Sequence, residues 1–216
     1  MELFIDTANI DEIREIARWG VIRGVTTNPK IFAKEGVDLR TRVEEILEIV
    51  SGPLSVEVTT NDPAEMIIEA QKLAAWSKHI VVKLPMSPAG LEAASVLKNK
   101  GIKTNVTAIM TVNQAMLAAS AGATYASIFY SRISDLGHDG LDVIRQSAQL
   151  FKQSNFTTKI IVGSIRLLTQ INDAALAGAD IITVPYKFFP ALAYHPQTEL
   201  TIQEFLNAWQ GTKTLA

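Results

Sequence analysis

Eight short runs of apolar and β-branched residues, each followed by a longer amphipathic stretch, place the strongest constraint on how this chain can fold. Ile80-Val81-Val82 and Ile160-Ile161-Val162 are continuously apolar, which is typical of parallel strands covered by helices. The pattern therefore predicts an α/β protein. The predicted strands are Leu3–Asp6, Val25–Thr27, Leu54–Thr59, His79–Leu84, Lys103–Thr107, Tyr125–Phe129, Lys159–Gly163 and Asp180–Val184.

The amphipathic stretches between these runs predict helices, and local signals mark several of their ends. Asn9 is a good N-cap with Glu12 three residues later, and Gly20 ends the same helix. Asp62 caps another helix whose first residue is Pro63. The predicted helices are Ile10–Trp19, Leu39–Val50, Pro63–Trp76, Pro88–Lys100, Val112–Ala121, Leu141–Ser154, Leu167–Ala177 and helical sequence after the eighth strand.

Strict alternation of strand and helix allows a doubly wound open sheet or a closed (β/α)8 barrel. Eight units favour the barrel, which commonly needs roughly 200–250 residues. No G-x-G-x-x-G or G-x-x-x-x-G-K-[ST] loop follows a predicted strand, which weakens the nucleotide-binding alternative. Because no linker or low-complexity tract divides the chain, we expect residues 1–216 to form a single-domain TIM barrel with an extra C-terminal helix.

The composition excludes several classes of site. The chain has no cysteine, so a disulfide scaffold, a thiol nucleophile and cysteine-ligated zinc are ruled out. His79, His138 and His195 form no ligand-spaced pair, and we expect no metal site. The net charge of −2 gives no basic excess for nucleic acid or an anionic membrane. With no signal peptide and no apolar run of about 18 residues, the expected location is the cytoplasm.

Polar side chains occur at the ends of the first seven predicted strands, where a barrel of this kind carries its active site. Simpler explanations exist: Asp6 can cap the following helix, Asn28-Pro29 can form a turn, and Ser164 and Arg166 can cap and form a salt bridge. The candidate site residues at these strand ends, with the apolar Phe129 included, are Asp6, Thr26, Asn28, Glu57, Lys83, Asn105, Thr107, Ser127, Phe129, Arg132, Ser164 and Arg166.

Lys83 is the most informative of these residues, because it interrupts the apolar run Ile80–Pro85. Lysine is seldom buried, and burial favours its neutral amine. Lys83 therefore either extends to solvent from the strand end or acts as an amine nucleophile. Glu57 is likewise a charged residue within an apolar strand, between Val56 and Val58. A carboxylate and an amine in one barrel mouth can compensate each other and exchange protons, so the pair indicates a site better than either residue alone.

Five segments carry a family resemblance that extends in order over essentially the whole chain. They are Phe4-Ile5-Asp6-Thr7-Ala8, Gly24-Val25-Thr26-Thr27-Asn28-Pro29, Ile80-Val81-Val82-Lys83-Leu84-Pro85, Asn105-Val106-Thr107 and Ala121-Gly122-Ala123-Thr124-Tyr125. With these motifs the chain resembles the short transaldolases, which are closely related to the fructose-6-phosphate aldolases. The resemblance implies a (β/α)8 barrel and a class I, Schiff-base mechanism without a metal or organic cofactor. The implied reaction belongs to the pentose phosphate pathway and transfers dihydroxyacetone from fructose 6-phosphate or sedoheptulose 7-phosphate to an aldose phosphate.

The resemblance also implies a role for each polar residue. Lys83 forms an imine with the ketose carbonyl, and Asp6 exchanges the proton of the C4 hydroxyl. Glu57 moves protons through a water that Thr107 holds. Thr26, Asn28, Asn105, Ser127 and Phe129 are implied to line the substrate site. Arg132, Ser164 and Arg166 are implied to bind the sugar phosphate, for which the arginine fork is suited.

Two other activities stay open. An aldolase would release free dihydroxyacetone, but its branch of the family tends to have glutamine, an apolar residue, alanine and tyrosine where this chain has Glu57, Asn105, Ser127 and Phe129. A non-catalytic barrel would only bind a sugar phosphate, and it would not need a lysine, two carboxylates and a threonine together.

The sequence departs from the family pattern at a few positions. Ile128 and Tyr130 replace proline and valine, and a one-residue slip of their strand would turn Tyr130 into the site. Lys30 and Gly163 replace the usual serine and alanine. These changes leave the preferred acceptor open.

The C-terminal segment carries an apolar stripe of Ile202, Phe205, Leu206 and Trp209 at helical spacing. This helix either closes its own barrel or packs on a neighbouring subunit. The resemblance implies rings of subunits, with the terminal helix on a neighbour. Because a soluble monomer rarely exposes such a patch, we expect a homo-oligomer, a pentamer or a decamer.

Overall fold

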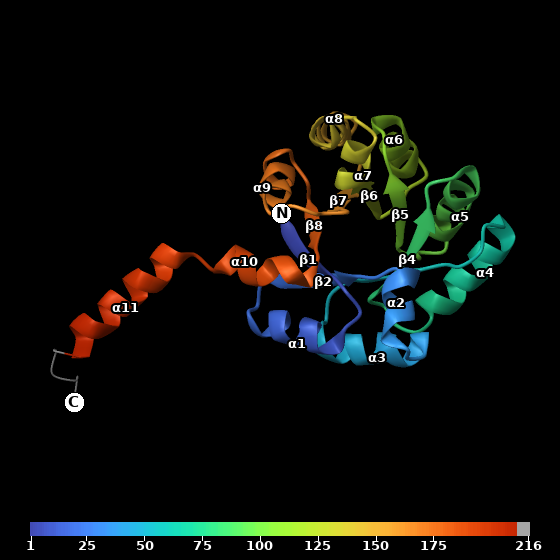
Figure 1. The fold of residues 1–216 in the computed structure, drawn as a ribbon. Helices are drawn as coiled ribbons and strands as arrows, with labels where there is room; N and C mark the ends of the chain where they lie inside the picture. Colours follow the sequence, from blue (N-terminus) through green and yellow to red (C-terminus); the bar gives the residue numbers. More distant parts are fainter. Residues whose placement is uncertain (211–216) are drawn as a thin grey trace.

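Parallel strands that pair in sequence order form the centre of the protein (Figure 1). In this computed structural model, which describes residues 1–210, β8 pairs with β1 and closes the barrel. The predicted (β/α)8 barrel is therefore confirmed, and the open-sheet alternative is wrong. The strands are β1 (Glu2–Asp6), β2 (Ile22–Thr26), β3 (Leu54–Glu57), β4 (Ile80–Pro85), β5 (Thr104–Ile109), β6 (Tyr125–Phe129), β7 (Lys159–Gly163) and β8 (Ile181–Val184).

Helices surround the barrel, and the last of them extends away from it (Figure 1). They are α1 (Ile10–Arg18), α2 (Pro29–Glu35), α3 (Leu39–Ile49), α4 (Pro63–Ala74), α5 (Pro88–Asn99), α6 (Val112–Ser120), α7 (Tyr130–Asp135), α8 (Gly140–Gln153), α9 (Thr169–Leu176), the 3-10 helix η1 (Tyr186–Phe188), α10 (Phe189–Ala193) and α11 (Pro196–Gln210). Within residues 1–210, no helix combines the length and apolarity needed to cross a membrane.

Two short helices, α2 and α7, are absent from the sequence-based prediction. The Asn28-Pro29 pair, which also fits a turn, in fact starts α2: Asn28 accepts a hydrogen bond from the Ile31 amide at 3.1 Å, and Pro29 occupies the first turn. Helix α7 follows β6 directly and has no side-chain cap, so no local signal marks its start.

The strand slip considered for β6 does not occur. Strands β6 and β7 pair without a register shift along the whole length of β6. Phe129 keeps its place at the end of β6, and Tyr130 is buried as the first residue of α7. The bulk of Tyr130 is accommodated because the residue above its ring is Gly140, where a Cβ would lie 2.7 Å from Tyr130 Cδ2.

The inside of the barrel is built in two layers. At the amino ends of the strands a cluster of buried hydrophobic side chains fills the interior; its members are Phe4, Val81, Tyr125, Ile161 and Ile181. Side chains two residues further along a strand face the same way. Those positions are occupied by Asp6, Lys83, Ser127, Gly163 and Thr183. The apolar layer is therefore the floor beneath a polar layer at the carboxyl ends.

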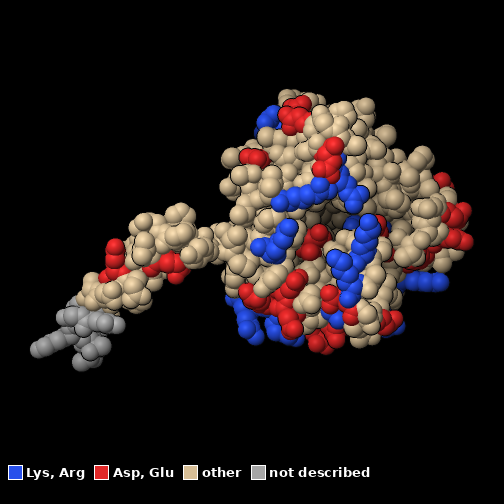
Figure 2. Space-filling model, viewed as in Figure 1, with Lys and Arg blue, Asp and Glu red and all other residues tan. Residues whose placement is uncertain are grey.

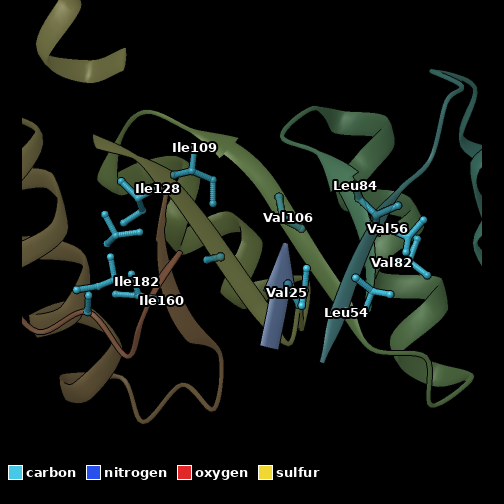
Figure 3. Close-up of a cluster of buried hydrophobic side chains, with 14 of the residues drawn as sticks. Val25, Leu54, Val56, Val82, Leu84, Val106, Ile109, Ile128, Ile160 and Ile182 are labelled. Carbon is cyan, nitrogen blue, oxygen red and sulfur yellow. The ribbon is translucent and has the colours of Figure 1, made fainter. Parts of the chain in front are cut away.

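The larger hydrophobic core lies between the barrel wall and the helices. The strand residues between the inward-facing ones supply it, as the alternation of strand side chains requires (Figure 3). Those labelled in Figure 3 are Val25, Leu54, Val56, Val82, Leu84, Val106, Ile109, Ile128, Ile160 and Ile182. This core holds the strands at fixed positions, so the polar layer inside them is held rigidly as well.

Gly24 makes room for the floor of the barrel. A Cβ on Gly24 would lie 2.7 Å from Phe4 Cζ and 2.7 Å from the Pro53 carbonyl oxygen. Phe4 is fully buried, and the Pro53 oxygen accepts the Val25 amide, so neither atom can move freely. Glycine at this position therefore lets the Phe4 ring fill the barrel.

We expect Gly24→Ala to lower the free energy of unfolding by about 1–3 kcal/mol, because it overpacks this layer. Gly163→Ala is the matched control in β7, since its nearest contact would be Thr183 Cγ2 at an ordinary 3.4 Å. That control is expected to be neutral or stabilising by up to about 1 kcal/mol. Urea unfolding of both variants measures the difference, and equal effects would contradict this account of the floor.

Candidate active site

A cavity of about 120 Å³ opens at the carboxyl ends of the strands, above the apolar floor. Figure 2 shows a hollow in the middle of the barrel with lysine and arginine side chains around its rim. The cavity is lined by Asp6, Thr26, Asn28, Lys83, Asn105, Thr107, Ser127, Phe129, Arg132, Gly163, Ser164 and Thr183. Every predicted site residue except Glu57 and Arg166 thus faces one small cavity.

Lys83 lies at the centre of this site and is only 6% exposed. Its Nζ donates to the Thr27 carbonyl oxygen at 2.9 Å and lies 3.0 Å from Glu57 Oε2. The ion pair follows from the barrel, because Glu57 of β3 and Lys83 of β4 are register partners. Lys83 therefore does not extend to solvent, and the Glu57 carboxylate is held within proton-transfer distance of its amine.

Asp6 faces the same cavity from β1. Its Oδ1 accepts a hydrogen bond from the Thr26 hydroxyl at 2.7 Å, and Thr26 Oγ1 lies 2.5 Å from Thr183 Oγ1. Burial raises the pKa of Asp6 above its ordinary value of 3.8, and the Thr26 hydrogen bond and the Lys83 charge offset part of that rise. A carboxyl group with a raised pKa is suited to exchanging protons close to neutral pH.

Asn105 and its neighbours form a directed hydrogen-bond chain across the cavity wall. Ser127 Oγ donates to Asn105 Oδ1 at 2.8 Å, and Asn105 Nδ2 donates to Ser55 Oγ at 3.3 Å. All three side chains are buried. This chain fixes the orientation of the Asn105 amide, and residues 1–210 leave its second N–H available to a bound molecule.

Thr107 is the other inward-facing residue of β5. Within residues 1–210 its buried Oγ1 has no hydrogen-bond partner, although it lines the cavity. The following residue, Ala108, has a φ of 63°, and the pairing of β5 with β6 shifts register between Val106 and Ile109. A strained residue beside an unpaired buried hydroxyl is typical of a functional site, where a bound water or substrate completes the hydrogen bonding.

The rim of the cavity carries two of the three predicted phosphate-binding residues. Arg132 on α7 lies 5.1 Å from the centre of the Phe129 ring, and Ser164 follows β7 with a φ of 60°. Arg166 does not line the cavity. Its Nη1 instead pairs with Asp135 at 2.7 Å, in line with the salt bridge weighed for it above, and both side chains are about half exposed.

Gly163 and Thr183 line the cavity without being predicted as site residues, and Thr183 is the one with a side chain. It lies within the run Ile181–Val184, which looks uniformly apolar, and threonine is common in strands. The available signal is its position two residues after the floor residue Ile181, which places it on the inward face. Glu57 does not line the cavity but contacts Lys83, which does; it also lines an apolar groove beside α2.

A second and larger groove, of about 800 Å³, lies at the opposite end of the barrel. Lys159 begins β7 there and Asp180 directly precedes β8. Asp180 accepts a hydrogen bond from the Ile160 amide at 2.8 Å, which ties the strands together at their amino ends. Residues 1–210 contain no group of three or more side chains able to hold a metal ion. The predicted site residues line the cavity at the carboxyl ends instead.

Comparisons with known proteins identify the family. The family model described as Transaldolase/Fructose-6-phosphate aldolase matches residues 3–215. A relative named probable transaldolase from Heliobacterium modesticaldum is 50% identical over 213 residues, which is 99% of each chain. Another of that name, from Caldicellulosiruptor saccharolyticus, is 49% identical over 211 residues, or 97% of each chain.

A solved structure shares only the fold. It is a thiamine phosphate pyrophosphorylase from Pyrococcus furiosus, with a TM-score of 0.57 and 14% identity over 85% of each chain. The family match and the two relatives agree over almost the entire length, and the chain belongs to the transaldolase/fructose-6-phosphate aldolase family.

Proposed function

We propose that this protein is a transaldolase that moves a dihydroxyacetone unit between sugar phosphates through a Schiff base on Lys83. The observation that carries the proposal is a buried lysine amine, 3.0 Å from the Glu57 carboxylate, in a cavity that Asp6 also lines. A proton acceptor at this distance favours covalent catalysis by the amine, because only the neutral amine is a nucleophile.

In the proposed reaction Glu57 accepts a proton from the Lys83 ammonium, and the free amine attacks C2 of the ketose phosphate. Loss of water from the carbinolamine gives a protonated imine, with protons moving between Glu57 and a water bound by Thr107. The C3–C4 bond then breaks as Asp6 removes the proton of the C4 hydroxyl. The electron pair of the C3–C4 bond enters the protonated imine, and an aldose phosphate leaves.

The dihydroxyacetone unit stays on Lys83 as an enamine until an acceptor arrives. The enamine carbon attacks the aldehyde carbon of a second aldose phosphate, and Asp6 returns its proton to the new hydroxyl. Hydrolysis of the resulting imine frees the product ketose and the amine. Asn28, Asn105 and Ser127 are assigned to the hydroxyls of the three-carbon unit, and this sequence needs no metal or organic cofactor.

Transaldolase rather than aldolase activity is favoured by Glu57, Asn105, Ser127 and Phe129, whose types match that branch of the family. The proposed activity assigns the protein to the pentose phosphate pathway in the cytoplasm, with sugar phosphates and neither nucleic acid nor membrane as its partners. Arg132, Ser164 and Arg166 are assigned to the phosphate group, and Thr26 and Phe129 to the cavity wall.

A product assay with fructose 6-phosphate tests the proposed activity. We expect sedoheptulose 7-phosphate when erythrose 4-phosphate is present, and release of free dihydroxyacetone at least about tenfold slower when no acceptor is added. Equal rates of dihydroxyacetone release with and without the acceptor would identify an aldolase. If no product formed under either condition, the remaining hypothesis would be a non-catalytic barrel that only binds a sugar phosphate.

The raised pKa of Asp6 leads to a prediction with opposite effects on stability and turnover. Since the pKa in the folded state is above the unfolded value of 3.8, the ionised carboxylate lowers the free energy of unfolding. This cost shrinks as the pH falls below the folded-state pKa and is gone below the unfolded value. Asp6→Asn keeps an acceptor for the Thr26 hydroxyl but cannot ionise. We expect this variant to be more stable than the parent at about pH 8, and we expect this gain in stability to be smaller at about pH 5.

The same variant is expected to lose about 10²–10⁴-fold in turnover, because an amide cannot exchange the C4 proton. Urea unfolding at the two pH values and the transaldolase assay provide the measurements. A stability difference that stays constant or grows as the pH falls would contradict the assignment of a desolvated carboxyl group.

We also propose that the protein is a homo-oligomer, a pentamer or a decamer, held together through α11. This helix extends away from its own barrel, so the alternative that it closes that barrel is wrong (Figure 1). Leu200, Phe205, Leu206 and Trp209 are 53–69% exposed along it. Apolar side chains exposed to this extent on one helix are typical of a subunit contact.

Truncation of the chain before Pro196 tests this assembly. We expect light scattering to show an oligomer for the full chain and monomers or smaller assemblies for the shortened one. The circular dichroism spectrum of the shortened chain should lose only the helical signal of α11, because the helices that cover the strands precede residue 196. A monomeric full-length protein, or a shortened one of the same oligomeric order, would contradict the proposal.

A further inference from the structure

The residues assigned to the substrate phosphate come from two segments that are distant in the sequence. Arg132 lies on α7, and Ser164 and Arg166 lie on the loop between β7 and α9. A phosphate group is bound more tightly by two segments when their spacing is fixed before binding, because the cost of ordering them is then avoided. The contacts that hold α7 against this loop therefore decide whether the phosphate site is formed in advance of binding.

Gln170 makes the most extensive of these contacts. Its Oε1 accepts three hydrogen bonds: from Ser131 Oγ at 3.0 Å, from the Arg166 amide at 2.8 Å and from the Leu167 amide at 3.1 Å. Gln170 is 8% exposed and Ser131 is 3% exposed, so water does not compete freely for these bonds. A single side-chain oxygen thus joins the residue next to Arg132 with the backbone of Arg166.

A local explanation exists for two of the three bonds. Helix α9 has no side-chain cap at Leu168, and Gln170 turns back to bind the amides that precede the helix. The third bond does not fit that explanation, because Ser131 belongs to α7, thirty-nine residues away in sequence. A cap for α9 alone would not need a donor from another segment.

Other contacts between the two segments are weaker. The Ser131 amide donates to the Ser164 carbonyl oxygen at 3.3 Å, near the long end of the hydrogen-bond range. The Arg166–Asp135 pair joins the end of α7 to the loop, but both side chains are about half exposed, and exposed ion pairs contribute little. The Gln170 bonds are therefore the best-protected of these polar contacts that join α7 to the loop, beyond the point where the pairing of β6 with β7 ends at Phe129 and Gly163.

We propose that Gln170 is a positioning residue for phosphate recognition: through Ser131 and the Arg166 backbone it holds Arg132 and Ser164 at the spacing that a phosphate monoester requires. This inference rests on the proposed function for the identity of the substrate. It adds a residue that touches no substrate and yet determines the preference for phosphorylated over unphosphorylated sugars.

Gln170→Met tests the proposal, because methionine keeps the approximate shape of the side chain and removes the strong acceptor. We expect about tenfold increases in KM for fructose 6-phosphate and in the Kd of inorganic phosphate measured by calorimetry. The kcat with fructose 6-phosphate, and kcat/KM with unphosphorylated fructose as donor, should change less than about twofold. Gln146→Met, at an exposed position on α8, is the matched control and should change none of these values.

Ser131→Ala removes only the bond between segments and keeps the cap of α9, so it keeps the proposal testable if Gln170→Met fails to fold. We expect about threefold weaker phosphate binding from this variant, with no change in the circular dichroism spectrum. Equal losses with phosphorylated and unphosphorylated donors, or unchanged phosphate affinity in both variants, would reduce Gln170 to a helix cap and overturn the proposal. Phosphate affinity is measured without turnover, so a failure of the transaldolase proposal is seen separately, in the product assay of the unmodified chain.

Discussion

The alternation of side chains along closed parallel strands is the constraint on which the rest of this structure depends. Because residues two apart share a face, each strand that enters the barrel with an apolar residue presents its next inward position at the carboxyl end. Phe4 is followed by Asp6, Val81 by Lys83 and Ile181 by Thr183. The floor and the polar layer are thus set by the same registers, and a shift of one strand would disrupt both.

The polar layer is held by charge compensation inside a small volume. Lys83 contacts Glu57 directly, while Asp6 is stabilised by Thr26 and by the charge of Lys83. The barrel interior offers these groups little water, and burial raises the pKa of Asp6. The outcome is one amine and two carboxyl groups at one barrel mouth, an arrangement suited to forming an imine and moving protons on the same substrate.

Much of the fold follows from the sequence because apolar runs and helix-capping residues are local signals. The eight strands and the main helices agree with the pattern within a few residues, whereas α2 and α7 escape it because they are short and directly follow strands. Cavity residues are predictable where a charged or amide side chain interrupts an apolar strand, as Lys83 does. Thr183 is not predictable in this way because threonine is common in strands. Gln170 is not predictable because only the folded chain brings it to Ser131.

The partner that a long charged side chain contacts is also difficult to predict from the sequence. Arg166 lies at the expected place in the chain, yet its guanidinium pairs with Asp135 rather than lining the cavity. A local pattern specifies the position of the Cα atom through the strand, but several rotatable bonds separate that atom from the charge. The partner of such a residue depends on which segments the fold brings alongside it.

The central claim is that Lys83 forms a covalent imine with a ketose phosphate. Reduction with sodium borohydride in the presence of fructose 6-phosphate, followed by mass spectrometry of the peptides, measures it most directly. The account predicts a stable adduct on Lys83 alone, and no adduct in Lys83→Arg, because arginine stays protonated and cannot form the imine. An unmodified Lys83 peptide after reduction, or an adduct that persists in Lys83→Arg, would contradict the account.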